Sequence, residues 1–561
     1  SLSSRMEHLN ADLLIQVISY LNIIDSSSLC GVSRRMCYLT HQFRTLLGSQ
    51  ISTSSSSLAW ENERRRPQDN YGYCLSQMST KPNLAFTFTS DVIGQDLCYH
   101  LNHAGPNGLI VLGASASGIQ ANCDQRVEHE IDAALLLASF PTTKTTILPF
   151  SFTQPCDDKD YFLPSAPLWQ QLAAATPSSR CHDQDYWKVV IIYACGDGYY
   201  TVEDFVATLQ RKYPDMTIVG GICESGFVSV NVTKDYLAQK SEKDLEDLLH
   251  ARKVMGRLPK NKNENAVYKE ILIDQVWKAF EKRKYVVENV TDGIFGVALG
   301  GDIPVRSIVS RGVKSVTPVS ERDCWIVEKV TLLRPGESDY MFRGDPSLLK
   351  PTHVIQFVRN TATDKLLSPL ALLAGNKNPE FVGLRRPDTD GYELHPLSPF
   401  SLQSDSIVIM TDGSPEQEES IQYANIDFFI LDGVSCKNHM DKTLKSLQEA
   451  TIGEVILGGL MFSCSGRGPE RRSILREEMS DAKKFHKYFP KTNLCGFYAG
   501  GEIGPMAMAE QSRVFQRGKA AVQGFTAVFA LFIVPSMSLS DFHLDDSPEN
   551  TSTFMKELTS L

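Results

Sequence analysis

Three side chains capable of polar or nucleophilic chemistry follow two apolar runs towards the C-terminal end of the sequence. Cys464 and Arg467 stand in the segment Cys-Ser-Gly-Arg-Gly, and Glu502 follows a pair of glycines. A guanidinium in this setting could bind a carboxylate through two parallel hydrogen bonds, and backbone amides beside a thiol could lower its pKa. Two structural alternatives compete with these readings. Arg467 could pair with Glu502 and brace the two glycine loops, and the thiol could fill a tight core position.

The residues around these side chains predict a strand, a helix and a second strand. The run 455–462 is apolar and has the length of a buried strand. A helix stopped by Pro490 follows, because apolar residues recur at helical spacing: Leu475, Met479, Ala482, Phe485 and Phe489. Two strands joined by a helix favour a right-handed parallel unit. Ligands of such units bind beyond the carboxyl ends of the strands, where we expect Cys464, Arg467 and Glu502 to lie.

A second copy of this unit is visible in the first half of the sequence. The strand is 189–194, the loop is Cys195-Gly-Asp-Gly, and the helix carries Phe205 and Leu209. The next strand, 216–219, ends in a pair of glycines, with Glu224 close behind. This internal duplication predicts two related lobes. It adds a thiol to the candidate substrate- or ligand-binding residues, which are Cys195, Cys464, Arg467, Gly501 and Glu502.

The segments 461–468 and 494–504 resemble the C-terminal half of a FIST domain, a module of intracellular signalling proteins. The segments 108–119, 219–221 and 296–302 resemble its N-terminal half, so the resemblance covers about residues 86–535. It implies two mixed α/β lobes. It also implies a possible small ligand such as an amino acid, whose carboxylate and amine Arg467 and Glu502 would receive.

The N-terminal residues predict short amphipathic helices in the range 6–50. So small a helical unit cannot bury its own apolar face, and it resembles an F-box, which docks on a Skp-family adaptor and through it on a cullin. Asn10 and Met36 depart from the proline and tryptophan usual in that family. The alternative is an ordinary helical cap on the large domain. The expected adaptor-binding residues are Leu9, Leu13, Leu14, Val17, Ile18, Leu21, Leu29, Val32 and Met36.

Composition narrows the class of protein. The net charge is −10 and the pI is near 5.7, which argues against general nucleic-acid binding because that requires a basic surface. The 13 cysteines have no regular spacing and favour reduced thiols, hence the cytoplasm or the nucleus. The apolar segment 521–534 is shorter than a membrane helix and reads as a buried strand, so we expect no membrane partner.

We therefore expect an α+β protein with an N-terminal helical F-box followed by two related mixed α/β lobes. The expected boundaries are 6–50 for the F-box, 51–85 for a linker, 86–324 for the FIST N-terminal lobe, 325–537 for the FIST C-terminal lobe and 538–561 for an acidic flexible tail. The first lobe carries a charged helical insertion at about 234–284.

No enzyme signature accompanies this architecture. The sequence 113–118 lacks the lysine of a phosphate-binding loop, and no nucleophile elbow or zinc-protease motif is present. Cys436 and His439 have the spacing of half a metal site without a second half, so no metal or cofactor is expected. The expected function is that of a non-catalytic substrate receptor of a Skp–cullin–F-box ubiquitin ligase, which holds a protein substrate through the FIST lobes for ubiquitination and proteasomal degradation. The alternatives are a small-ligand sensor and a thiol redox switch.

Overall fold

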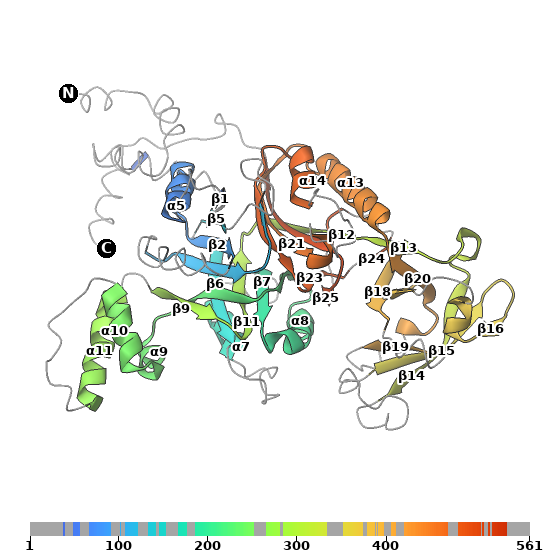
Figure 1. Ribbon diagram of the computed structural model, residues 1–561, viewed down its shortest axis with the longest axis horizontal. Helices are drawn as coiled ribbons and strands as arrows, with labels where there is room; N and C mark the ends of the chain where they lie inside the picture. Colours follow the sequence, from blue (N-terminus) through green and yellow to red (C-terminus); the bar gives the residue numbers. More distant parts are fainter. Residues whose placement is uncertain are drawn as a thin grey trace.

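The computed structural model describes parts of the chain between residues 38 and 535. The described residues are 38–39, 49–56, 67–90, 101, 107–121, 133–141, 145–152, 167–176, 186–251, 265–280, 284–333, 352–373, 379–387, 389, 391–397, 406–410, 420–468, 481–506, 508–509, 514–516 and 519–535. Within these residues the chain forms four sheets and eight α-helices (Figure 1). The prediction of a mixed α/β fold is therefore confirmed.

Two sheets carry most of the first half of the chain. Sheet I has the spatial order β1-β5-β2-β3-β9-β10. Its strands are β1 (Gln50–Ser56), β2 (Leu84–Thr89), β3 (Ile110–Ser115), β5 (Ala133–Ser139), β9 (Ser225–Asn231) and β10 (Tyr285–Val290). Sheet II has the order β25-β23-β8-β7-β11-β6. Its strands are β6 (Thr145–Phe152), β7 (Trp187–Cys195), β8 (Thr217–Ile222), β11 (Gly293–Gly301), β23 (Glu502–Pro505) and β25 (Ala520–Gln523).

The other two sheets carry most of the second half. Sheet III has the order β12-β26-β21-β22-β4. Its strands are β4 (Ile119–Ala121), β12 (Val305–Ser310), β21 (Glu454–Cys464), β22 (Leu494–Ala499) and β26 (Ala527–Pro535). Sheet IV has the order β16-β15-β14-β20-β17-β18-β24. Its strands are β14 (Trp325–Leu333), β15 (Thr352–Asn360), β16 (Leu366–Leu367), β17 (Phe381–Arg385), β18 (Tyr392–Pro396), β20 (Asn425–Leu431) and β24 (Met508–Ala509), with β13 (Val313–Ser315) on β20 and β19 (Ile407–Met410) on β15.

The described part of the chain contains eight α-helices. They are α5 (Pro67–Ser76), α7 (Pro167–Ala175), α8 (Gly198–Lys212), α9 (Lys234–Gln239), α10 (Glu242–Ala251), α11 (Asn265–Phe280), α13 (Gly433–Ala450) and α14 (Asp481–Tyr488), with 3-10 turns η5 (Val319–Glu321), η7 (Pro369–Leu373) and η9 (Ser465–Arg467). Apolar residues of α5 pack on sheet I, those of α7 and α8 on sheet II, and those of α13 and α14 on sheet III. In the part of the chain that the structure describes, no helix has the length and hydropathy needed to cross a bilayer.

Both predicted strand–helix–strand units are confirmed, although Leu475 and Met479 of the expected second helix lie outside the described residues. Strand β7 runs parallel to β8, and β21 runs parallel to β22. In each unit a glycine lets the second strand approach the first: a Cβ at Gly220 would lie 1.7 Å from the carbonyl oxygen of Ile192, and a Cβ at Gly496 would lie 1.7 Å from that of Met461. Because real Cβ atoms are not found so close to other atoms, both positions require glycine. The shared constraint supports the internal duplication.

The two halves exchange strands. Strand β4 of the first half pairs with β22 in sheet III, and β23 of the second half pairs with β8 in sheet II. A common core of buried residues from sheets I, II and III lies between these sheets. The site residues of the second half are therefore positioned partly by the first half.

One expected segment, 51–85, differs from the prediction, and another, the helical insertion at about 234–284, agrees with it. In 51–85, expected to be a linker, residues 51–56 belong to β1, and α5 follows. Serine and threonine form a strand there because β1 pairs along its whole length with the buried β5. The insertion at 234–284 forms α9, α10 and α11, which share a small apolar core and lie at one end of the molecule, opposite sheet IV (Figure 1). The proposed adaptor-binding residues and the tail 538–561 lie outside the described residues, although Leu39 is completely buried.

Candidate functional site

The structure brings three of the predicted site residues together. Cys464 ends β21, Arg467 lies in the 3-10 turn that follows, and Glu502 begins β23. All three are buried, with exposed fractions of 8%, 2% and 0%. Gly501 lies beside them, and its carbonyl oxygen accepts a hydrogen bond of 2.9 Å from the Ile222 amide at the end of β8. Gly501 therefore joins the two duplicated units.

Arg467 does not pair with Glu502 by a hydrogen bond, and its guanidinium is already occupied. Its Nε donates to Asp481 Oδ2 at 2.9 Å, and its Nη2 donates to Asp481 Oδ1 at 2.8 Å. Asp481 is the first residue of α14, and Ser463 Oγ also donates to its carboxylate. The remaining nitrogen, Nη1, donates to the Phe525 carbonyl at 3.3 Å. Arg467 thus braces the site, as the structural alternative proposed, although with a different partner.

Glu502 is a completely buried carboxyl group with only one oxygen paired. Its Oε2 accepts hydrogen bonds from the Thr526 amide at 3.1 Å and from the Thr526 hydroxyl at 2.9 Å. Its Oε1 is buried and has no partner among the described residues. Burial raises the pKa of Glu502 to about 8, although the hydrogen bonds from Thr526 act in the opposite direction. Glu502 is therefore mainly protonated at neutral pH.

This raised pKa predicts a dependence of stability on pH. In the window between the ordinary carboxyl pKa of 4.5 and about 8, the folded state holds a proton on Glu502 that the unfolded state has released. The free energy of unfolding should therefore fall as the pH rises through this window, with a slope on the order of 1 kcal/mol per pH unit. Replacing Glu502 by Gln keeps an acceptor for Thr526 and should remove this slope in urea unfolding curves.

The matched control changes a carboxyl group at the corresponding place of the first unit. Glu224 also follows a glycine pair, but it is exposed. The Glu224→Gln variant should keep the pH dependence of the natural chain. A Glu502→Gln variant with an unchanged slope would show that Glu502 is ionised in the folded state.

The two candidate thiols have environments that disfavour reactivity. Burial raises the pKa of Cys464 to about 12, and the neighbouring Glu502 acts in the same direction. Cys195 lies apart from this group. Its Sγ donates to the Val290 carbonyl at 3.5 Å, and burial also raises its pKa to about 12. Because the thiolate is the reactive form, both positions favour the structural role that we weighed for these cysteines.

A second arginine, absent from the predicted site, is buried with no carboxylate bound to it among the described residues. Arg311 follows β12 and is 2% exposed. Its Nη2 donates to Gln516 Oε1 at 3.1 Å, whereas Nε and Nη1 are buried and have no partner among the described residues. Burial lowers the pKa of Arg311 to about 9, so the group keeps its charge at neutral pH. Burying a cation without a counter-ion costs free energy, unless a ligand supplies the missing negative charge.

Arg311 lines a small pocket of about 40 Å³ between sheet IV and the turn that joins β25 to β26. Phe381 of sheet IV and residues 521–526 form the walls. Phe525 in this turn has a φ of 60°, a backbone conformation that non-glycine residues rarely adopt. The same turn makes hydrogen bonds to two other site residues: the Phe525 carbonyl accepts one from Arg467, and the Thr526 amide donates one to Glu502.

Cys436 and His439 of α13 reach this region too. His439 Nδ1 accepts a hydrogen bond of 3.3 Å from the Arg311 amide. Burial, together with the two neighbouring arginines, lowers the pKa of His439 to about 3, so the ring is neutral. Among the residues described, no cluster of three or more ligating side chains suits a metal ion. The Cys436–His439 pair instead packs beside the arginines.

Sequence reasoning missed Arg311, Asp481 and Gln516. The segment Ser-Arg-Gly at 310–312 contributed to the family resemblance, but nothing local showed that Arg311 would be buried. Asp481 carried a weak signal, since acidic residues are frequent in the first turn of a helix. Gln516 carried none.

Comparison with known proteins identifies the C-terminal part. Residues 377–505 match the FIST C domain family, which confirms that half of the resemblance. The chain is 31% identical over 122 residues to a Mycobacterium bovis protein named Uncharacterized protein Mb0898c, covering 22% of this chain and 28% of that protein. It is 33% identical over 113 residues to Uncharacterized protein Rv0628c of Mycobacterium tuberculosis, covering 20% and 25%. The chain therefore spans about a quarter of the length of these distant relatives.

Proposed function

We propose that this chain is a sensor for a small carboxylate-bearing ligand, which binds beside Arg311 where residues of the FIST C match, such as Phe381, form one wall. The observation that carries the proposal is the completely buried guanidinium, whose Nε and Nη1 find no partner among the described residues although it lines a pocket. A carboxylate there would supply the counter-ion and the missing hydrogen-bond acceptors at once. Arg311 thus takes the role that the sequence suggested for Arg467.

The size of the pocket indicates how such a ligand would act. A cavity of about 40 Å³ has room for a carboxylate group, since a cavity needs only about 10–15 Å³ to hold one water molecule. The rest of a larger ligand would have to displace the turn at Gly524 and Phe525. The Phe525 carbonyl in that turn binds Arg467, and Thr526 binds Glu502. Because Arg467 also pairs with Asp481, movement of the turn would reach the start of α14. A ligand that binds the conformation with the displaced turn more tightly than the other would then shift the population towards that conformation.

The geometry favours this sensor over the thiol switch. A switch would need an accessible thiol with a lowered pKa, whereas both Cys195 and Cys464 are buried with raised pKa values.

A thermal-shift screen of free amino acids and short carboxylic acids tests the proposal. A ligand present at 100 times its dissociation constant should add about 2.7 kcal/mol to the free energy of unfolding and raise the melting temperature. Amines of similar size without a carboxylate serve as controls and should give no shift. If no carboxylate in the panel raises the melting temperature at millimolar concentration, the sensor role is refuted.

A second role, as a substrate receptor of a Skp–cullin–F-box ligase, rests on the apolar stripe of the N-terminal sequence. It is compatible with a sensor, since a ligand could control which protein substrate binds. Replacing Leu13 and Val17 by Asp would put charges on the docking face at a cost of several kcal/mol. We expect this double variant to lose co-purification with a Skp-family adaptor. Unchanged recovery of the adaptor would exclude this role.

A further inference from the structure

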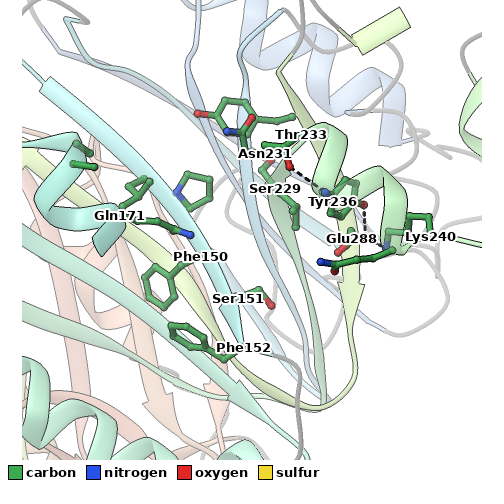
Figure 2. Close-up of a pocket in the computed structure, with 17 residues that line it drawn as sticks. Phe150, Ser151, Phe152, Gln171, Ser229, Asn231, Thr233, Tyr236, Lys240 and Glu288 are labelled. Atoms are coloured by element: carbon green, nitrogen blue, oxygen red, sulfur yellow. Dashed lines mark hydrogen bonds and ion pairs between the residues drawn. The ribbon is translucent and has the colours of Figure 1, made fainter. Parts of the chain in front are cut away.

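An open groove of about 990 Å³ lies between sheet II and the helical insertion, away from Arg311. Strand β6 and helix α7 form one wall, and β9, α9 and β10 form the other. Figure 2 shows Phe150, Ser151 and Phe152 on one side and Tyr236, Lys240 and Glu288 on the other. The volume is at the upper end of the range for ligand pockets.

The groove follows the edge of β6 rather than one of its faces. Five consecutive residues of this strand, 148–152, line it. Successive side chains of a strand point to opposite faces, so a hollow on one face would touch only alternate residues. Strand β6 is the last strand of sheet II among those described, with β11 as its neighbour. The lined part of the edge is about 16 Å long at 3.3 Å per residue.

Pro149 indicates which backbone groups face this edge. Proline has no N–H, so a strand tolerates it where the backbone nitrogen points away from the neighbouring strand. The backbone nitrogen of Pro149 therefore faces the groove. The N–H groups of Ile147 and Ser151, two residues away on either side, point the same way. The Ser151 hydroxyl is also buried here, with no partner among the described residues. An edge with unpaired donors and acceptors is a template for another strand.

The two walls differ in character. Phe150 and Phe152 present aromatic rings, with centroids 5.7 Å apart. On the opposite wall, Glu288 accepts hydrogen bonds from the Tyr236 hydroxyl and from Lys240, whose Nζ lies 4.8 Å from the Tyr236 ring centre. These contacts hold the opposite wall in place.

Beyond Glu288 the groove continues into a second open hollow of about 390 Å³. This hollow is lined by Lys240 and by residues 288–292, which include the carboxylates of Glu288 and Asp292. Lys240 balances one of the two carboxylates, so this end carries a net negative charge. The charge complements a basic side chain on whatever occupies the groove.

We propose that this groove binds an extended peptide of a partner protein, which adds to β6 as a further strand. Alternate apolar side chains of the peptide pack on Phe150 and Phe152, and a lysine or arginine lies at the end formed by Glu288 and Asp292. Backbone hydrogen bonds to the β6 edge supply affinity, and the side-chain positions supply specificity. This site does not depend on the ligand site beside Arg311.

The test begins with random peptides displayed on phage and selected on the whole chain. Ala174 is an exposed residue of α7 that lines the groove, whereas its exposed neighbour Ala173 does not. The Ala174→Trp variant should block the groove and lose the selected peptides, and Ala173→Trp should retain them. We expect the selected sequences to alternate apolar residues and to end in a basic residue. A selection that yields no peptide distinguishing the two variants would overturn the proposal.

Synthetic peptides from this selection test the strand pairing in fluorescence polarisation measurements. Ser151→Pro removes one N–H from the edge and should weaken binding by about tenfold, the equivalent of one lost hydrogen bond, whereas Ser151→Ala should bind normally. N-methylation of alternate peptide residues should have the same effect, and N-methylation of the intervening ones should be tolerated. Tolerance at every position would indicate a ligand held by side chains alone and would contradict strand addition. Glu288→Gln keeps an acceptor for Tyr236 and should reduce the preference for the basic residue.

Discussion

Replacing Arg467 by Met should lower the free energy of unfolding by about 3–5 kcal/mol, the usual cost of removing one partner from a buried ion pair. The methionine would leave the Asp481 carboxylate buried, with Ser463 Oγ as its remaining hydrogen-bond donor among the described side chains. Burial acts to lower the pKa of Arg467, but the Asp481 carboxylate outweighs it and keeps the pKa above the ordinary value. Arg467 therefore keeps its charge throughout the accessible pH range.

Urea unfolding and thermal melting of three variants check this result. Arg467→Met and Asp481→Leu should each destabilise the chain, because each leaves one charge unpaired. The double variant should recover most of the loss, since two apolar side chains of similar volume can replace a buried pair at little cost. A double variant as unstable as the sum of the single ones would contradict the ion-pair explanation. The stability of the Arg467→Lys variant should lie between that of the natural chain and that of Arg467→Met, because lysine keeps the charge but cannot make two parallel hydrogen bonds.

The order of elements in this region could be predicted from the sequence, because it depends on local patterns. Apolar runs with strand length, a helical stripe and two glycine loops led to β21, α14 and β22 in parallel pairing. The same patterns led to β7, α8 and β8. Gly220 and Gly496 have matching contacts in the two units, which explains why the duplication is visible in sequence.

The partners of the charged side chains could not be predicted in the same way. Arg467 had Glu502 as its obvious candidate, since both were expected at the same end of two adjacent strands. The structure gives it Asp481 instead, because η9 turns the guanidinium towards the start of α14. Arg311 enters from β12, far away in the sequence, and is buried only because sheet IV packs over it. Such pairings follow from the docking of sheets, for which a single sequence carries no local signal.

The pairing of β4 with sheet III was missed for the same reason. Ile119 ends a segment that resembles the first half of the family and Gln120 follows it, yet they pair with Phe497 and Gly496. The boundary that we drew between two lobes therefore separates residues that share a sheet.

Replacing Arg311 by Met should have the opposite effect on stability from the same change at Arg467. The guanidinium of Arg311 is buried with Gln516 as its one hydrogen-bonded side-chain partner among the described residues. Its removal would relieve the cost of burying an unpaired charge and would lose one hydrogen bond worth about 1 kcal/mol. We expect a net gain of about 1–3 kcal/mol in the free energy of unfolding. The variant should also lose the thermal shift caused by carboxylate ligands.

Arg306 provides the matched control, because it lies on β12, which leads directly to Arg311, and receives the same substitution. It pairs with Glu454 at the surface, where the two side chains are 34% and 21% exposed. Arg306→Met should change stability by less than about 1 kcal/mol and leave the ligand response intact. Loss of stability in Arg311→Met comparable to that of Arg467→Met would show that Arg311 has a structural task, and the ligand role would fail. A gain in stability together with a lost response would instead mean that the chain keeps a costly buried charge for a ligand.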